Sequence, residues 1–220
     1  AAVGGVFTTT SGGYGSVTAL TLNPLSGTVA YSGVIADGAA GMSLTKTGAG
    51  TQVLTGVKTY TGNTQVSGGT LQIANLNSPT ATTTVDSGAI LIVGNAGTGA
   101  IKQGTLVVNG TATVLASTPS TPGAEVGNDG GASHVNTLTI GNGGGAYPRT
   151  YTGTLDLKNN DLIADSATLP DVTDALRSGS NNTFWTGTGI TSSTAASSSG
   201  ATALGVIQNI VNPVTGSGGA

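Results

Sequence analysis

The chain has no cysteine, one histidine and one tryptophan, and charged residues make up only 7% of its 220 positions. Without cysteine, no disulfide framework, thiolate metal site or thiol nucleophile can form. The single histidine, His134, excludes a multi-histidine metal site. A nucleic-acid partner is also excluded, because binding phosphates needs clustered Lys and Arg, and the chain has six, widely scattered.

Long apolar runs are missing as well. No stretch approaches the ~18 consecutive apolar residues of a membrane-spanning helix, so we expect no membrane-spanning segment. The chain opens on AAVGGVF without methionine, and an alanine here is compatible with signal-peptide cleavage. Sparse charge with abundant Thr, Ser, Asn and Gly is typical of secreted surface proteins. We therefore predict a secreted, extracellular or cell-surface location.

What the chain has in quantity is glycine, threonine and serine, at 38, 38 and 20 residues. Its net charge is only −3, whereas disordered chains usually combine low hydrophobicity with high net charge. We therefore expect a folded chain built from β-branched residues and turn formers.

Short β-type runs recur along the sequence, and many alternate Thr or Gln with Leu, Val or Ile. This period of two is typical of half-buried strands. The expected strands are 28–31, 42–45, 51–54, 64–67, 70–73, 89–93, 105–108, 111–115, 136–140, 154–157 and 161–164. No helical pattern lies between these runs, which excludes a βαβ architecture.

Two all-β architectures remain, a hairpin-based sandwich or barrel and a β-solenoid. The strands are short and unevenly spaced, and aromatic residues make up only 4% of the chain, whereas sandwich cores usually depend on aromatics. These features favour stacked rungs of parallel strands. We predict an all-β, right-handed parallel β-solenoid, with one short C-terminal helix.

Residues 31–35 and 43–73 carry a family resemblance. They read YSGVI and SLTKTGAGTQVLTGVKTYTGNTQVSGGTLQI, which resembles the autotransporter-associated β-strand repeat. The segment departs from that pattern at Val57-Lys58, where Ala-Asn is usual, and at Asn63, where Gly is preferred. Residues 151–165 and 185–193 are similar to the terminal region of large secreted repeat proteins of Planctomycetes and Verrucomicrobia. The resemblance implies a parallel β-helix passenger with a surface or matrix role and no catalytic residues.

Three segments are expected along the chain. Residues 1–27 form an N-terminal strand segment, residues 28–165 the solenoid, and residues 166–220 a C-terminal cap. In the cap, Thr168 or the next residue could cap a helix over 170–179, with Pro170 in its first turn, Arg177 in its last and Gly179 ending it. Stretches 116–134 and 191–202 read as loops.

Candidate chemistry is sparse. Asp156, Asp161 and Asp165 cluster in sequence near Arg149 and Lys158, which would suit a polysaccharide lyase, but a solvated edge with a local salt bridge explains them better. A Ca²⁺ site at Asp161/Asp165 or Asp129/Glu125 lacks a dense acidic loop. We expect His134 to be an exposed loop residue.

Tyr31 and Tyr60 are expected to pack over rung corners or to stack on each other, with sugar binding as an alternative. Asn109 and Asn181 begin N-glycosylation sequons, which a bacterial source would make irrelevant. We predict no catalytic, cofactor-binding or metal-binding residues.

The predicted function is a non-catalytic structural subunit of an extracellular fibre, sheath or matrix. Residues 16–22 and 203–211 resemble strands without a local partner, although the apolar spacing of 203–211 also fits a short helix. Either segment could pair with another copy and give a head-to-tail filament. The alternative is an adhesin or glycan-binding passenger module of a larger cell-surface protein. The expected partners are therefore copies of the chain and surface glycans.

Overall fold

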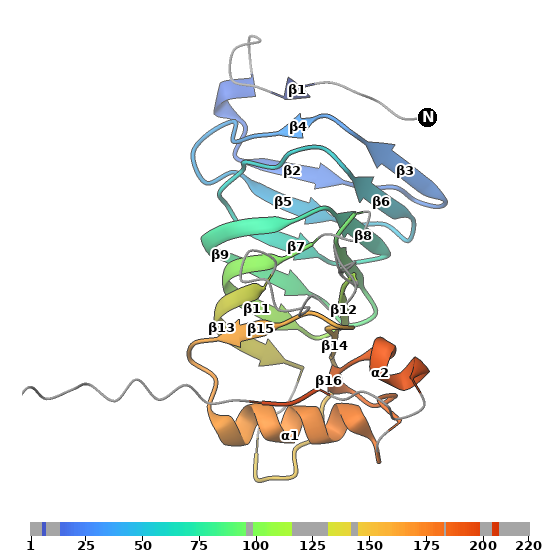
Figure 1. Ribbon diagram of the computed structural model, residues 1–220. Helices are drawn as coiled ribbons and strands as arrows, with labels where there is room; N and C mark the ends of the chain where they lie inside the picture. The colour runs from blue at the N-terminus through green and yellow to red at the C-terminus, as the bar shows by residue number, and fades with distance from the viewer. Residues whose placement is uncertain are drawn as a thin grey trace, which may run out of the picture.

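The computed structural model describes residues 6–7, 14–95, 99–115, 132–141, 145–182, 184–198 and 204–206. They form a coil of stacked rungs in which every pairing between strands is parallel. The coil runs down the molecule from the N-terminal strands to helix α1 (Leu169–Ser180) (Figure 1). The predicted all-β parallel solenoid is thereby confirmed.

Two seven-stranded sheets form the long walls. In order along its wall, sheet A contains β16 (Gly189–Thr191), β14 (Thr154–Asp156), β12 (Thr111–Val114), β10 (Ile90–Val93), β8 (Thr70–Ile73), β6 (Thr51–Leu54) and β3 (Thr28–Tyr31). Sheet C contains β15 (Leu162–Ala164), β13 (Ser133–Ile140), β11 (Ile101–Val108), β9 (Leu76–Val85), β7 (Thr64–Val66), β5 (Ser43–Lys46) and β2 (Ala19–Leu22).

A short third wall closes each rung. It begins with β1 (Val6–Phe7) paired to β4 (Val34–Ile35), and Ile35 forms a parallel bridge to Lys58. Further down, the first halves of β9, β11 and β13 occupy this wall before the same strands bend into sheet C. The bend is visible as a register shift between Gln103 and Thr105.

The rungs keep a constant register along sheet A. Its first positions are Thr28, Thr51, Thr70, Ile90, Thr111, Thr154 and Gly189, each paired with the next. Successive partners are 23, 19, 20, 21, 43 and 35 residues apart (28 to 51, 51 to 70, 70 to 90, 90 to 111, 111 to 154, 154 to 189). Five of these seven positions are threonine, so hydroxyls and methyls stack in a ladder outside the coil.

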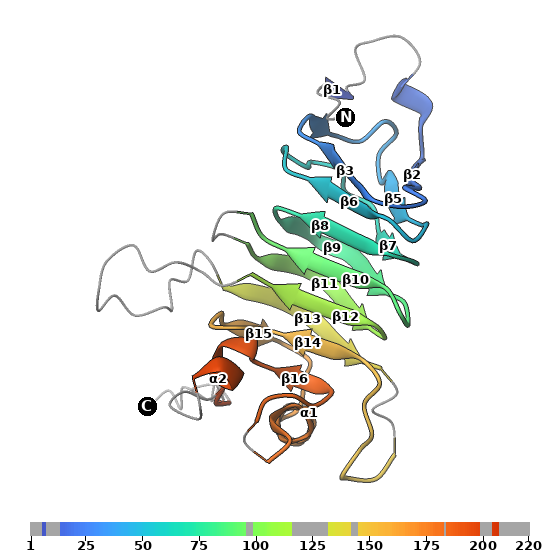
Figure 2. The same cartoon turned by 90° about the vertical axis from the view of Figure 1, so that its right-hand side faces the viewer.

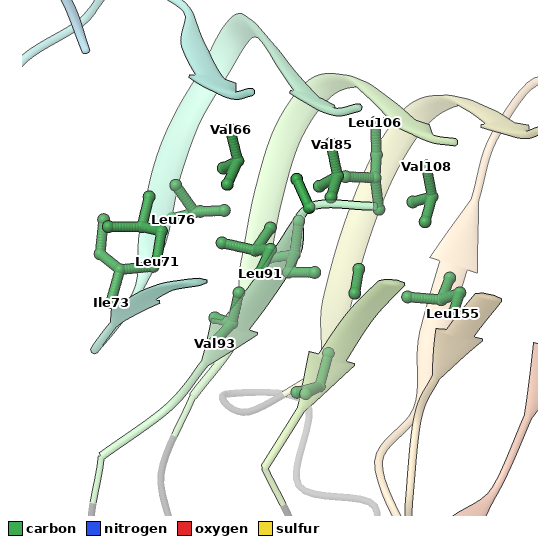
Figure 3. Packing of buried hydrophobic residues seen from close by; sticks show 14 of the residues in the cluster. Val66, Leu71, Ile73, Leu76, Val85, Leu91, Val93, Leu106, Val108 and Leu155 are labelled. Carbon is green, nitrogen blue, oxygen red and sulfur yellow. The ribbon is translucent and has the colours of Figure 1, made fainter. Parts of the chain in front are cut away.

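The interior is filled by side chains that repeat from rung to rung. Val66, Val85 and Val108 form one column on sheet C, and they face Leu71 and Leu91 across the coil (Figure 3). All five side chains are fully buried. Each fully buried aliphatic side chain contributes about 1.5–3 kcal/mol by leaving water, so this stack is the main stabilising element of the fold.

The core also holds a lysine. Lys46 of β5 is fully buried in the column between Leu22 and Val66. Its ammonium group donates to the carbonyl oxygens of Thr47 at 2.6 Å, Gly48 at 3.0 Å and Gly68 at 2.9 Å. All three N–H donors are thus used, which satisfies a charge that would otherwise be costly to bury. Burial lowers the pKa of Lys46.

Glycines sit where rungs touch at a corner. A Cβ atom on Gly56 would overlap the carbonyl groups of Ser32 and Gly33 in the preceding rung, and one on Gly62 would overlap those of Gly41 and Met42. Close approach of the two backbones therefore requires glycine at these corners.

The two ends of the coil differ. At the N-terminal end, β2 and β3 are the edge strands of their sheets, and Val29 is 39% exposed although Leu71, two rungs below in the same column, is fully buried. At the other end, α1 lies across the last rung beside β16, seen nearly end-on in Figure 2. One end of the coil is therefore covered by a helix, whereas the described residues leave the edges of β2 and β3 unpaired.

Several sequence-based expectations need correction. Strand β2 pairs with β5 of the same chain, so the segment 16–22 has a local partner. The stretch 191–202 was expected to be a loop, but Thr191 belongs to β16 and Ser193–Ser197 forms a second helix, α2. A 3₁₀ turn, η1 (Tyr14–Ser16), precedes β2. Most of the strand expected over 203–211 lies outside the described residues, and 204–206 are not in a strand.

Strand β9 was not expected. Its sequence, LNSPTATTTV, contains Pro79 and reads as a turn region. The strand forms because Leu76, Ala81 and Val85 are buried in the coil, and packing there outweighs the local turn preference.

Candidate functional site

Helix α1 organises the C-terminal end of the coil. Thr168 has extended backbone angles, and its side chain accepts a hydrogen bond from the Asp171 backbone N–H, as expected for an N-cap. Pro170 occupies the first turn, and Arg177 the last. The predicted helix and its cap are confirmed.

The end of α1 differs from the prediction. The helix ends at Asn181, whose positive φ of 40° forms the C-cap, and Gly179 lies inside it. A Cβ atom on Gly179 would overlap the carbonyl oxygen of Ile190, so glycine is required there for helix and strand β16 to touch. Gly179 was predicted to end the helix, but it lies within the helix, at a close contact with strand β16.

We call α1 and the preceding residues 145–153 that contact it the end cap. Asp174 lies buried at its centre. Its carboxylate accepts hydrogen bonds from the Arg149 backbone N–H at 2.9 Å, the Tyr151 hydroxyl at 3.2 Å and the Arg177 guanidinium. Burial alone would raise the pKa of Asp174, but these hydrogen bonds outweigh it and hold the pKa below its usual value. The carboxylate thus connects α1 to the segment that precedes β14.

A second carboxylate, Asp171, lies one turn earlier. It accepts from the Thr168 hydroxyl at 2.6 Å and the Tyr147 hydroxyl at 2.5 Å, and it forms an ion pair with Arg149. These hydrogen bonds, Thr168 first, lower the pKa of Asp171. The Arg149 guanidinium also lies 4.4 Å from the centre of the Tyr147 ring, so the three side chains form one cluster.

A cavity of about 500 Å³ opens beside this cluster, between α1 and the edge of sheet C. Its lining has an apolar part and a polar part. The apolar part comprises Leu138, Ile140, Tyr151, Ala167, Val172, Ala175 and Ile190, and the polar part comprises Asn109, Thr139, Arg149, Ser166 and Asp171. Strand β15 pairs only with the first half of β13, so residues 137–140 form a strand edge at this cavity.

The three acids singled out in the sequence lie apart from this cavity and from one another. Asp156 is buried and accepts from the Ser193 hydroxyl at 2.7 Å and the Lys158 backbone N–H at 3.0 Å, so it connects β14 to α2. Asp161 and Asp165 are exposed on opposite ends of β15. Arg149 pairs with Asp171 instead, so the acids and the arginine do not form one site.

His134 was expected to be an exposed loop residue. It is exposed, but it lies in strand β13, because the strand begins at Ser133 inside the stretch that reads as a loop. Its Nε2 lies 2.9 Å from Asp165 Oδ2, and both side chains are about half exposed, at 48% and 51%. A polar contact so exposed contributes little, about 0–1 kcal/mol.

No group of three or more His, Cys, Asp or Glu side chains in the described part of the chain could hold a metal ion. The alternative calcium pair, Asp129 with Glu125, lies outside the described residues. Likewise, no described helix is long and apolar enough to cross a membrane.

Tyr31 and Tyr60 are both buried and belong to different walls. Tyr31 pairs with Leu54, and the Tyr60 hydroxyl lies 2.7 Å from Thr64 Oγ1 inside the coil. They act as packing residues and do not stack in register. Asn109, the first sequon position, is half-buried at the cavity, whereas Thr183 of the second sequon lies outside the described residues.

The sequence did not identify Tyr147, Asp171 and Asp174 as a cluster. A signal was present, since Asp171 and Asp174 are spaced three apart on the helix and therefore share one face. Arg149 and Tyr147 lie 22 or more residues earlier in the chain, so local spacing could not predict that they contact these aspartates.

The geometry defines a protein class, a parallel β-solenoid with a helix-covered C-terminal end. Residues 44–73 match the family described as passenger-associated-transport-repeat. The matched segment covers β5 to β8, so the repeat corresponds to the second and third rungs, and the predicted resemblance is confirmed there. No curated protein and no solved structure matches the chain. This repeat is a structural element of autotransporter-type passengers, which indicates a secreted or cell-surface protein.

Proposed function

We propose that the chain is a non-catalytic structural module, displayed outside a bacterial cell as part of a passenger. The observation that carries this proposal is the match over residues 44–73, because the matched rungs continue in one register to β16. A repeat that sets the geometry of the whole described coil is the framework of the protein, not an accessory to another fold.

The side chains of the described residues support a structural role. Their buried carboxylates are used in fixed contacts, Asp156 between β14 and α2 and Asp174 between α1 and the preceding segment. General acid–base catalysis needs a group that is positioned to exchange a proton with substrate. A carboxylate with two or three internal hydrogen bonds and a lowered pKa, such as Asp174, is a poor proton donor.

A passenger module is favoured over the head-to-tail fibre. Such a fibre needs two complementary free ends, and α1 covers the C-terminal end beside β16. The unpaired edges of β2 and β3 at the N-terminal end support contact with another chain at that end.

Display can be tested by placing the chain between a signal peptide and an autotransporter translocator in a Gram-negative host. We expect folded, protease-resistant protein on intact cells, detected by antibody labelling. Gly56→Val is the matched control, because its side chain would collide with the preceding rung and prevent folding after export. Retention of the unchanged chain inside the cell would contradict the proposal.

A further inference from the structure

The cavity beside α1 has a lining that matches a defined kind of ligand. We propose that it binds a neutral saccharide unit. This inference rests on the proposed function, since it names the ligand class of a surface-displayed module, whereas its test depends on the cavity alone. Its volume of about 500 Å³ lies within the roughly 300–1,000 Å³ of small-molecule sites.

Charge is the first argument for a neutral ligand. The lining contains one cation, Arg149, and one anion, Asp171, and these two groups pair with each other. An anionic ligand would have to compete with Asp171 for the guanidinium, and a cationic ligand would have to compete with Arg149 for the carboxylate. The lining therefore favours a ligand without net charge.

The hydrogen-bonding groups are the second argument. Thr139 and Ser166 are exposed hydroxyls, and Asn109 presents a half-buried amide, so the rim offers both donors and acceptors. The edge of β13 adds backbone groups, because no described strand pairs with residues 137–140 on the side of α1. A sugar hydroxyl is donor and acceptor at once, and it can use such a mixed rim fully.

The apolar part of the lining is the third argument. Leu138 and Val172 are half-buried aliphatic side chains of the lining. Pyranose rings have an apolar C–H face and a hydroxyl-bearing edge, and a lining that combines aliphatic and hydrogen-bonding groups can contact both. A free apolar ligand would leave the hydroxyls and the amide without partners, which is costly on burial.

The test is titration of the purified full chain with neutral disaccharides, followed by calorimetry and NMR. The probes are cellobiose, maltose, lactose and N,N′-diacetylchitobiose, with glucuronic acid and an apolar peptide for comparison. We expect at least one neutral probe to bind with a Kd of about 1 mM or tighter. Saturation by glucuronic acid or the peptide instead, or no binding by any neutral probe, would overturn the proposal.

Variants locate the site. Thr139→Val keeps the side-chain shape but removes the hydroxyl, and we expect about tenfold weaker binding from the lost hydrogen bond. The matched control is Thr84→Val, two rungs earlier in the same column of sheet C, which should bind like the unchanged chain. Ala167→Phe should block the cavity. Equal affinity in all three variants would show that the sugar binds elsewhere, while surface display would stand unaffected.

Discussion

Lys46 and Gly68 belong to successive turns of the coil, yet the Lys46 ammonium donates to the Gly68 carbonyl oxygen at 2.9 Å inside the core. The same lysine also binds two carbonyls of its own corner, Thr47 and Gly48. A cation whose three N–H groups all donate to carbonyl oxygens thus stabilises the contact between two rungs.

Lys46→Met should destabilise the fold by about 2–4 kcal/mol, because three carbonyl oxygens lose a charged donor and methionine cannot replace it. Urea unfolding followed by circular dichroism measures the change. The control is Lys102→Met on the outer face of β11, which should stay within about 0.5 kcal/mol of the unchanged chain. Equal stability of the two variants would mean that the Lys46 contacts contribute nothing.

Gly56→Ala should cost about 1–3 kcal/mol, because the added methyl group would overlap the carbonyls of Ser32 and Gly33. Thermal unfolding is the measurement. Gly15→Ala has no atom within 4 Å of the new methyl group and serves as the control. If both substitutions lower the melting temperature equally, the rungs do not touch at this corner.

Much of the coil could be predicted because its signal is local. Strands such as β6 and β8 alternate Thr or Gln with aliphatic residues, and this pattern fixes both the strand and the face that it buries. Strand β9 could not be predicted, since Pro79 and its polar neighbours read as a turn and only burial against other rungs makes them extended. The end-cap cluster was missed for a related reason: Asp174 and Tyr151 are joined by packing, over a separation of 23 residues.

Acid should destabilise the end cap before it destabilises the strands of the coil. The pKa values of Asp171 and Asp174 are lowered in the folded chain, so their stabilisation is present above the usual Asp pKa of about 3.9 and is lost as the pH falls through the folded values. As the pH falls below about 3.9, the α1 amides should therefore lose protection from hydrogen exchange before those of β8. Asp174→Asn should show this faster exchange already at neutral pH, whereas Asp161→Asn, at an exposed position, should not.

Alkaline pH tests the partly buried Lys58. Burial lowers its pKa to about 8 in the folded chain, against about 10.4 when unfolded. The unfolded state therefore binds more protons between these values, and stability should rise as the pH increases from about 8 to about 10. Lys58→Met should reduce that rise, leaving the part that the lowered pKa of Lys46 contributes, and Lys102→Met should retain it in full. An unchanged pH profile for Lys58→Met would show that the ammonium is well solvated.

Association should stop at small species. The N-terminal end presents the unpaired edges of β2 and β3, whereas α1 lies against β16 at the other end, so two copies should meet through their N-terminal ends more readily than head to tail. Sedimentation velocity at rising concentration should show monomers and at most dimers. Filaments in electron microscopy would instead restore the head-to-tail fibre.

The uneven spacing of the rungs has a consequence for engineering. Partners in sheet A lie as few as 19 and as many as 43 residues apart, yet their register is unbroken. Additional residues between paired strands therefore leave the strand register unchanged. The length of the coil thus depends on the number of rungs, while foreign epitopes or enzymes inserted at an exposed corner, such as Ser87–Gly88 between β9 and β10, would be held at a chosen rung.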